Sequence, residues 1–451
     1  MPADPLRFPY RDQLLLPVIG LEAEFRVFVD GREIVPEEVW RAPAAFITRP
    51  LLRRSSKASQ LPTGGAVYFD GGVLEVVTPV IEIAPQCTAR AVRSLWEQIG
   101  FVRDQLDGWE RRNAKDVRLE AFSCHFNISY EIARDERSRH RTIQKLALLL
   151  ASLLPVPAIV TGANRRSTGV GVRPRRDRIE ITFDFTPDPG MMAATAALIV
   201  GIVRDVIAWP SYRVEELEKR GLPVLEGLKP GKHETRNGWI ARDSHFPRNP
   251  FTTPVDAKVW LVRGGRMLSM REIALETATH FRDSIRRSSD AFSWRLLFSI
   301  LRGESPSLLD LDDRPSAYGD VGRAIRWGTT LPELHNYATG GRRSSDLDDP
   351  PWRGKNIDRR THVTLPPRIE RRETGERRSG SRPGSPAPVS RSAYERVFRQ
   401  LGSGKRLLIG RELLTPVGVR GWYHAVFKNA RGEEQLMTID QVLEKMEGWR
   451  A

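Results

Sequence analysis

Cysteine is scarce in this chain of 451 residues, which contains only Cys87 and Cys124. Two isolated cysteines supply neither the disulfide framework of a small secreted domain nor the cysteine and histidine spacing of a structural zinc site. No motif supports a serine or cysteine nucleophile either. We therefore rank zinc proteins and nucleophile-based hydrolases low, and we expect a reducing compartment, the cytoplasm.

Long apolar runs are also missing. The most apolar stretches, 146–154 and 191–203, end at Pro155 and Arg204, short of the ~20 apolar residues that a helix needs to cross a bilayer. The N-terminal residues show no basic segment followed by an apolar one, so no secretory signal is expected. The sequence predicts two buried helices here and no membrane partner.

Basic residues outnumber acidic ones, which leaves a formal net charge of +15. Basic surfaces attract phosphate backbones through counterion release, so nucleic acid is one partner to consider. Much of the arginine excess falls in 342–391, where Ser, Pro and Gly are frequent and apolar residues are too few for a core. We predict a large domain over 1–340, a disordered basic linker over 341–392 and a small α+β module over 393–451.

Four short stretches alternate apolar and polar residues: 21–27 (LEAEFRV), 69–78 (FDGGVLEVVT), 122–130 (FSCHFNISY) and 178–185 (RIEITFDF). Alternation with period two is typical of strands that have one buried face. Apolar stretches of helical length, 142–154 and 191–209, follow the third and the fourth of them. This order predicts an α+β fold, with an antiparallel sheet and helices on its apolar face.

The polar positions of these strands carry groups that bind metals. Glu22 and Glu24 point to the same side of one strand, about 6 to 7 Å apart at Cα. Glu75 and Glu180 add oxygen donors of the kind that Mg²⁺ prefers, and Mg²⁺ commonly shares its coordination with substrate phosphates. A solvated strand edge paired with Arg26 is the alternative for the first pair. The repetition of the pattern on four strands favours a metal–nucleotide site.

Basic and amide side chains accompany the carboxylates. His125 and Asn127 share the polar side of their strand, although a lone histidine in a strand is more often structural. The segment TGANRRSTGVGVRPRRDR at 161–178 combines glycines, which let backbone amides approach an anion, with arginines, which grip phosphate oxygens in pairs. It matches neither a Walker loop nor a Rossmann fingerprint. We predict that Arg165, Arg173 and Arg178 hold phosphate.

Taken in order, these motifs resemble the carboxylate-amine ligases related to glutamate-cysteine ligase and glutamine synthetase. GLEAEFRVF resembles the GxExEF opening of that family, GGVLEVVTP its E-x-x-TP segment, CHFNIS its histidine-containing strand and RIEITFDF its last glutamate-bearing strand. The resemblance covers roughly residues 15–210. It implies a sheet of glutamine-synthetase-like type whose polar face holds two or three divalent ions, Mg²⁺ or Mn²⁺, that bridge ATP.

The resemblance further implies an ATP-dependent ligase, in which a carboxylate is phosphorylated and an amine then displaces the phosphate. The substrates would be a small-molecule or peptide carboxylate and an amine. Matched motif by motif, the implied metal ligands are Glu22, Glu24, Glu75, His125 and Glu180, the implied catalytic residues are the same four glutamates with Arg173, and the implied nucleotide contacts are His125, Asn127, Arg165, Arg173 and Arg178.

One position departs from the family pattern, because Thr182 stands where glutamine synthetases have an arginine two residues after the last glutamate. The alternative is therefore a non-catalytic, ligase-like scaffold whose basic linker and C-terminal module engage nucleic acid or a protein partner. A third reading is a guanidine kinase, which has a related sheet but phosphorylates nitrogen. Neither the substrates nor the oligomeric state follows from the sequence.

Overall fold

The computed structural model describes residues 14–49, 51–54, 57–131, 140–334 and 393–447. The strands of these residues that join one large sheet are β1 (Val18–Val29), β2 (Arg32–Ile34), β3 (Leu52–Arg53), β4 (Ala58–Gln60), β5 (Ala66–Asp70), β6 (Val73–Val77), β7 (Ile81–Glu82), β8 (Val117–Ser129), β9 (Val170–Pro174), β10 (Arg178–Phe183), β11 (Gly231–Lys232), β12 (Trp239–Ala241), β15 (Leu407–Ile409), β16 (Glu412–Arg420), β17 (His424–Lys428) and β18 (Glu434–Thr438). A separate hairpin pairs β13 (Trp260–Val262) with β14 (Arg266–Leu268).

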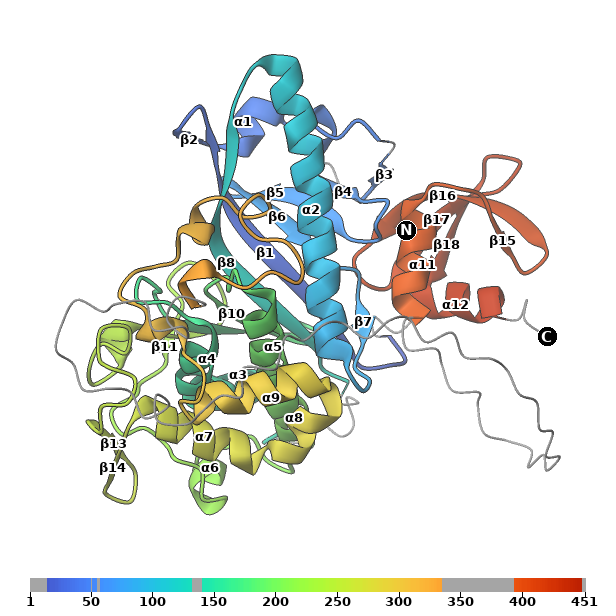
Figure 1. The fold of residues 1–451 in the computed structure, drawn as a ribbon. Helices are drawn as coiled ribbons and strands as arrows, with labels where there is room; N and C mark the ends of the chain where they lie inside the picture. Colours follow the sequence, from blue (N-terminus) through green and yellow to red (C-terminus); the bar gives the residue numbers. More distant parts are fainter. Residues whose placement is uncertain (1–13, 50, 55–56, 132–139, 335–392, 448–451) are drawn as a thin grey trace, which may run out of the picture.

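The sheet runs in the order β11-β12-β9-β10-β8-β1-β6-β5-β4-β3-β16-β17-β18, with β2, β7 and β15 paired outside this path. Its described strand pairs are antiparallel, apart from the parallel contact between β3 and β16. Helices cover one side of it, so the protein is of the mixed α+β class (Figure 1).

The described α-helices are α1 (Pro36–Trp40), α2 (Cys87–Asn113), α3 (Ile143–Leu153), α4 (Pro155–Gly162), α5 (Pro189–Ile207), α6 (Glu215–Lys219), α7 (Met270–His280), α8 (Arg282–Ser288), α9 (Ala291–Leu301), α11 (Ala393–Gly402) and α12 (Ile439–Glu447). Short 3₁₀ turns lie at η1 (Pro43–Ala45), η2 (Asp243–His245), η3 (Leu308–Asp310) and η4 (Ser316–Gly319). The predicted helix at 142–154 is α3, which Thr142 caps by accepting a hydrogen bond from the amide of Lys145.

β1 and β8 form the middle of the sheet, and their alternation separates two faces as predicted. Leu21, Ala23 and Phe25 on the apolar face are fully buried. Phe25 meets the Phe185 ring edge-on at 5.6 Å between centroids, and Trp96 of α2 stacks on Phe185 at 5.5 Å. The long helix α2 thus closes the apolar face, which leaves the opposite, polar face open for chemistry.

The second alternating stretch, 69–78, is not one strand. It forms a hairpin of β5 and β6, because Gly71 and Gly72 adopt positive φ angles of 60° and 93° that reverse the chain. The two glycines were a turn signal inside an apparently continuous pattern. The correction moves Phe69 and Asp70 to the strand preceding the one that carries Glu75.

Helix α5 is long and apolar enough to cross a bilayer by length and composition alone. In the structure 83% of its apolar window is buried against other parts of the protein, in agreement with the predicted buried helix. Asp188 caps its first turn by accepting a hydrogen bond from the amide of Met191 at 2.9 Å. Its apolar surface packs against α2, α8 and α9, so this helix belongs to the protein core.

Residues 393–447 form a small unit of β15–β18 between α11 and α12, drawn in orange and red beside β3 and β4 (Figure 1). Thr438 and Gln441 cap the start of α12 reciprocally. The apolar core of this unit includes Val18 of β1 and Val80, which precedes β7, so the unit shares buried surface with the N-terminal part of the protein. The predicted linker at 341–392 lies outside the described residues, and the predicted domain boundaries stay a prediction.

Candidate functional site

The register of the central strands places the predicted carboxylates on one face. Glu22 of β1 lies opposite His125 of β8, and Glu24 lies between Ser123 of β8 and Glu75 of β6. Directly opposite residues of antiparallel strands point to the same side of a sheet, with Cβ atoms about 4.5 to 5.5 Å apart. The four side chains predicted from separate motifs therefore meet in two adjacent rows.

A third row completes the cluster on the other side of His125. Asn127 of β8 lies opposite Glu180 of β10, and Glu180 in turn lies opposite Arg173 of β9. Gly20 of β1 occupies the same row beside Asn127. We call the group of Glu22, Glu24, Glu75, His125 and Glu180 the carboxylate cluster.

His125 lies at the centre of this cluster. Its Nδ1 is 3.1 Å from Oε2 of Glu22 and 3.8 Å from Oε1 of Glu180, while its Nε2 is 3.5 Å from Oε1 of Glu24. Burial alone would lower the pKa of the imidazole, but the hydrogen bond to Glu22 and the charge of Glu24 outweigh it and raise the pKa above its usual value. The raised pKa favours the imidazolium form, whose positive charge would balance part of the negative charge of the carboxylates.

The carboxylates themselves differ in ionisation. Burial opposes charge on Glu22 and Glu24, but His125 outweighs it, so the pKa of each is lowered. For Glu75, burial and then the adjacent Glu24 and Glu22 all disfavour the charged form, and its pKa is raised to about 10. Glu75 is therefore protonated at neutral pH, because the cluster has more carboxylates than positive charge to match them.

Two arginines of the predicted anion-binding segment reach Glu180. Arg173 contacts one of its carboxylate oxygens, and Nε of Arg175 donates to the other, Oε2, at 2.9 Å. Arg178 turns the opposite way and donates from Nε to Oδ1 of Asn127 at 2.8 Å. Arg165 does not join the site, since its Nε donates to the backbone carbonyls of Leu309 and Leu311. The structure does not bring Arg165 to Glu180 or His125, and its predicted phosphate role stays a prediction.

The donor set suits a hard divalent cation. Mg²⁺ prefers carboxylate oxygens, and a cation at this place would relieve the repulsion that keeps Glu75 protonated. As the side chains stand, the described residues contain no group of three acidic, histidine or cysteine ligands arranged around one point. Glu180 is instead paired with arginines and Glu24 with Ser123. Metal binding would require these side chains to exchange those partners for the ion.

A cleft of about 790 Å³ opens directly onto the cluster. Glu24, Ser123 and His125 form part of its floor, and Thr182 and Gly171 continue the floor along β10 and β9. Its lining includes six arginines: Arg26, Arg166, Arg173, Arg236, Arg242 and Arg314. Guanidinium groups in such number favour a ligand that carries carboxylate or phosphate. His233 also lines the cleft.

Sequence reasoning gave no role to Asp184, which lines the same cleft. Its Oδ2 accepts hydrogen bonds from Oγ of Ser167 at 2.7 Å, from the Tyr318 hydroxyl at 3.2 Å and from Nδ2 of Asn164. Burial raises its pKa to about 6, against the opposing effect of Ser167 and the charge of Arg314. The alternation of β10 already placed Asp184 on the polar face, but Tyr318 lies too far along the chain to be linked to it from sequence.

Tyr68 and Arg175 were missed as well. Tyr68 of β5 lies opposite Glu75 and is hydrogen-bonded to it, which the expectation of a single strand over 69–78 concealed. Arg175 stands in a run of arginines, where composition alone does not show which guanidinium turns inward. Both contacts depend on strand register and loop geometry.

The fold and the polar face define an α+β protein with a carboxylate cluster on the open side of a large antiparallel sheet. No family model matches the chain, and no curated protein matches it. Among the solved structures that are similar is the complex between the prokaryotic ubiquitin-like protein Pup and its ligase PafA, at 12% sequence identity and a TM-score of 0.44, over 96% of this chain and 93% of that chain. At that level of similarity the function has to be argued from the residues of the polar face.

Proposed function

We propose that this protein is an ATP- and Mg²⁺-dependent ligase of glutamine-synthetase-like fold that joins a carboxylate to an amine. One observation carries the proposal: Glu22, Glu24, Glu75, Glu180 and His125, predicted from four separate motifs, meet on one face of the sheet beside an arginine-lined cleft. Phosphoryl transfer requires charge neutralisation and alignment more than covalent help from the protein. A carboxylate cluster with adjoining arginines provides both.

The residues divide into two groups along β1. Glu22 and Glu180 both approach Nδ1 of His125, whereas Glu24 lies with Glu75 and Ser123 one row further on. The first group would hold one divalent ion and the second group another, and such ions neutralise phosphate oxygens when bound. Arg173 and Arg175, now paired with Glu180, would then be released to contact the transferred phosphoryl group.

This arrangement also accounts for the departure at Thr182. The missing arginine would have come from β10 itself, in the row of His125 and Gly171. Arg173 and Arg175 bring two guanidinium groups to the neighbouring row from β9 and the turn that follows it. The positive charge is thus present, although it comes from a different strand than in the glutamine synthetase pattern.

The proposed chemistry has two steps. A carboxylate oxygen of the first substrate, held by arginines of the cleft, attacks the γ-phosphorus of ATP, so that an acyl phosphate forms and ADP leaves. The nitrogen of the amine then attacks the acyl carbon, the C–O bond to phosphate breaks, and phosphate leaves as the amide forms and the nitrogen loses a proton. Arginines such as Arg166, Arg236 and Arg242 favour a carboxylate donor with further negative charge, an amino acid or a peptide.

Thermal unfolding with and without Mg·ATP tests the nucleotide site. Ligand at 100 times its dissociation constant should stabilise the native protein by about 2.7 kcal/mol. We expect this shift in the wild type and its loss in the Glu22→Gln/Glu24→Gln double variant. Glu433→Gln/Glu434→Gln, which alters two exposed glutamates remote from the cluster, is the matched control and should keep the shift. A wild type that Mg·ATP does not stabilise would exclude the ligase.

Trapping the intermediate tests the reaction. Hydroxylamine should convert the acyl phosphate of an accepted amino acid or peptide carboxylate into a hydroxamate, with one ADP formed for each hydroxamate. A screen of acidic amino acids and acidic peptides would reveal the donor. Formation of a stable phosphorus–nitrogen product on a guanidine compound, without any hydroxamate, would identify a guanidine kinase instead.

A further inference from the structure

A tryptophan of the C-terminal unit lies on the polar face of the large sheet. Trp422 stands in the turn between β16 and β17, and a Cβ atom placed on Gly20 of β1 would lie only 3.1 Å from Cζ2 of its ring. Gly20 shares its face with Glu22 and Glu24. The absence of a side chain at Gly20 is therefore what allows the indole to reach the row of Asn127 and Glu180.

Arg178 and Asn127 complete this end of the face. The guanidinium of Arg178 lies 4.8 Å from the centre of the Trp422 ring, and its Nε donates to Oδ1 of Asn127. Since arginine only donates, the Asn127 atom that accepts from it must be the oxygen, which fixes the orientation of the amide. Nδ2 of Asn127 is then a donor, and it is fully buried without a hydrogen-bond partner in the described residues. Such a group normally has a partner, and a ligand would supply it.

The positions of Gly20, Glu22 and Glu24 along β1 define where Trp422, Arg178 and Asn127 lie relative to the carboxylate cluster. Gly20 precedes Glu22 by two residues and Glu24 by four, at a rise of about 3.3 Å per residue. A triphosphate lying along Glu24 and Glu22 would place its nucleoside at the Gly20 end. There the indole and guanidinium planes offer stacking surfaces that suit a purine.

We infer that Trp422, with Arg178 and Asn127, binds the nucleoside part of ATP, so that the C-terminal unit completes the nucleotide site of the large sheet. The inference rests on the proposed ATP-dependent function and deepens it. Stacking on Trp422 and Arg178 would select a base, and Nδ2 of Asn127 would donate to a ribose or phosphate oxygen. The arginine-lined cleft at the Glu24 end is left to the carboxylate substrate.

The unit has other contacts that hold it in place without the indole. The amide of Tyr394 donates to Oε1 of Glu82 at 2.7 Å, and Arg399 forms an ion pair with Glu97 of α2. Val18 and Val80 are buried in its apolar core. Replacing Trp422 should therefore leave the unit docked, which makes the substitution a usable test.

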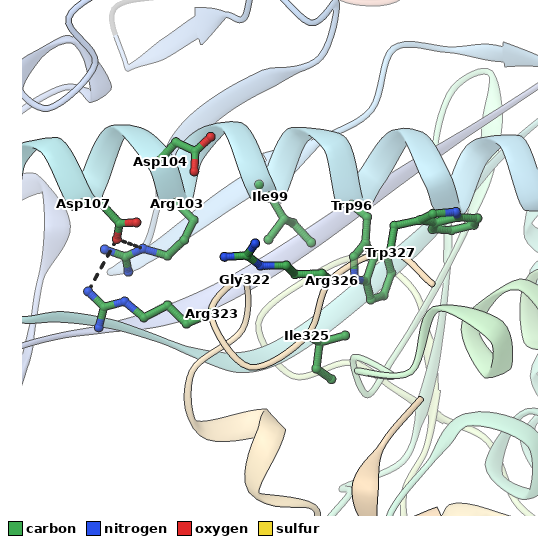
Figure 2. A pocket seen from close by; sticks show the side chains of 11 residues that line it. Trp96, Ile99, Arg103, Asp104, Asp107, Gly322, Arg323, Ile325, Arg326 and Trp327 are labelled. Carbon is green, nitrogen blue, oxygen red and sulfur yellow. Dashed lines mark hydrogen bonds and ion pairs between the residues drawn. The ribbon is translucent and has the colours of Figure 1, made fainter. Parts of the chain in front are cut away.

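The test compares two ligands that share a triphosphate but differ in the nucleoside. Dissociation constants for Mg·ATP and for Mg·tripolyphosphate are measured calorimetrically on the wild type, on Trp422→Ala and on Trp422→Phe. We expect Trp422→Ala to weaken ATP by about five- to ten-fold, the effect of losing one stacked base, and to leave tripolyphosphate unchanged. Trp422→Phe should retain most of the affinity for ATP. Trp327→Ala, at an exposed tryptophan beside α2, is the matched control (Figure 2).

Each outcome decides between the two proposals. If the wild type binds neither ligand, both the function and this inference are wrong. If the wild type binds ATP but Trp422→Ala binds it equally well, or loses both ligands equally, only the inference is wrong. If Trp422→Ala does not fold, photolabelling of the wild type with 2-azido-ATP replaces it: label in the peptide containing Trp422 supports the inference, and label in the peptide containing Trp239 of the cleft overturns it.

Discussion

Two groups of buried charges in this protein are built in opposite ways. Beside α2, Arg103 forms ion pairs with Asp107 at 2.8 Å and Glu110 at 2.9 Å, and Arg323 pairs with the same two carboxylates. Figure 2 shows Arg103 and Arg323 beside Asp107. Each of these carboxylates has an arginine partner. In the carboxylate cluster, Glu24 and Glu75 instead face each other, and Glu75 remains neutral.

The difference distinguishes a network in which every acid is paired from a cluster with an excess of acids. Nη1 of Arg103 also donates to the carbonyl of Val117 at 2.8 Å, so the network joins α2 to β8 and leaves no carboxylate without a partner. Arg323 is paired with acids in the same way. Burial alone would lower its pKa, but its hydrogen bonds to Asp116 and Glu110 outweigh burial and raise the pKa. A group of acids that is short of positive charge, by contrast, can gain from a bound cation.

The largest expected effect concerns the structural network. Arg103→Met should lower the free energy of unfolding by about 3 to 5 kcal/mol, because it removes a buried guanidinium that pairs with Asp107 and Glu110 and leaves the carbonyl of Val117 without its donor. Denaturant titration measures the loss, and Mg·ATP binding of the folded fraction should be unchanged. Arg323→Met is the control: its side chain is 34% exposed, so a loss well below that of Arg103→Met is expected. Equal losses would contradict the ranking by burial.

The second prediction concerns pH and Asp184. Burial raises the pKa of Asp184 to about 6 from a reference of 3.8. A raised pKa contributes stability below the unfolded value that is lost as the pH rises through the folded value. Between pH 4 and pH 7 the wild type should therefore lose about 2 to 3 kcal/mol relative to Asp184→Asn, at ~1.36 kcal/mol per pKa unit. Denaturant titrations of both proteins across this range measure the difference, and a constant difference would contradict the shift.

These predictions depend on contacts of different origin, only some of which could be predicted from the sequence. The alternation around Glu22, His125 and Glu180 was enough to place them on one face, because side-chain direction in a strand follows directly from position. Their meeting in one cluster depends on strand order, which the alternation of single strands does not predict. Their roles as metal ligands stay predictions.

What the sequence did not provide lies mainly in loops and long-range contacts. Arg165 and Arg175 look alike in an arginine-rich segment, yet one binds backbone carbonyls and the other Glu180. The local sequence pattern does not predict the direction or the hydrogen-bond partner of each arginine side chain. Trp422 is hundreds of residues from Gly20, so its place over β1 follows from the way in which the C-terminal unit docks on the rest of the protein.

The smallest expected effect concerns Glu75, and it directly tests the difference between the carboxylate cluster and the network beside α2. Without divalent cations, Glu75→Gln should raise the free energy of unfolding by about 1 to 2 kcal/mol, because it removes an acid that other carboxylates crowd. Glu110→Gln, the matched change in the structural network, should lower it, because Arg103 and Arg323 lose part of their counter-charge. Denaturant titration in EDTA measures both.

With Mg·ATP present, we expect the stability gained from the ligand to be reduced by the Glu75 substitution but not by the Glu110 substitution. The wild type should gain stability from the ligand, Glu110→Gln should gain as much, and Glu75→Gln should gain less, because an amide is a poorer Mg²⁺ ligand than a carboxylate. For an acid that binds the metal, we therefore expect the substitution to stabilise the free protein and to reduce the stability gained from Mg·ATP. If Glu75→Gln destabilised the protein without the ligand and left the gain from Mg·ATP intact, the cluster would be a structural network like the one beside α2.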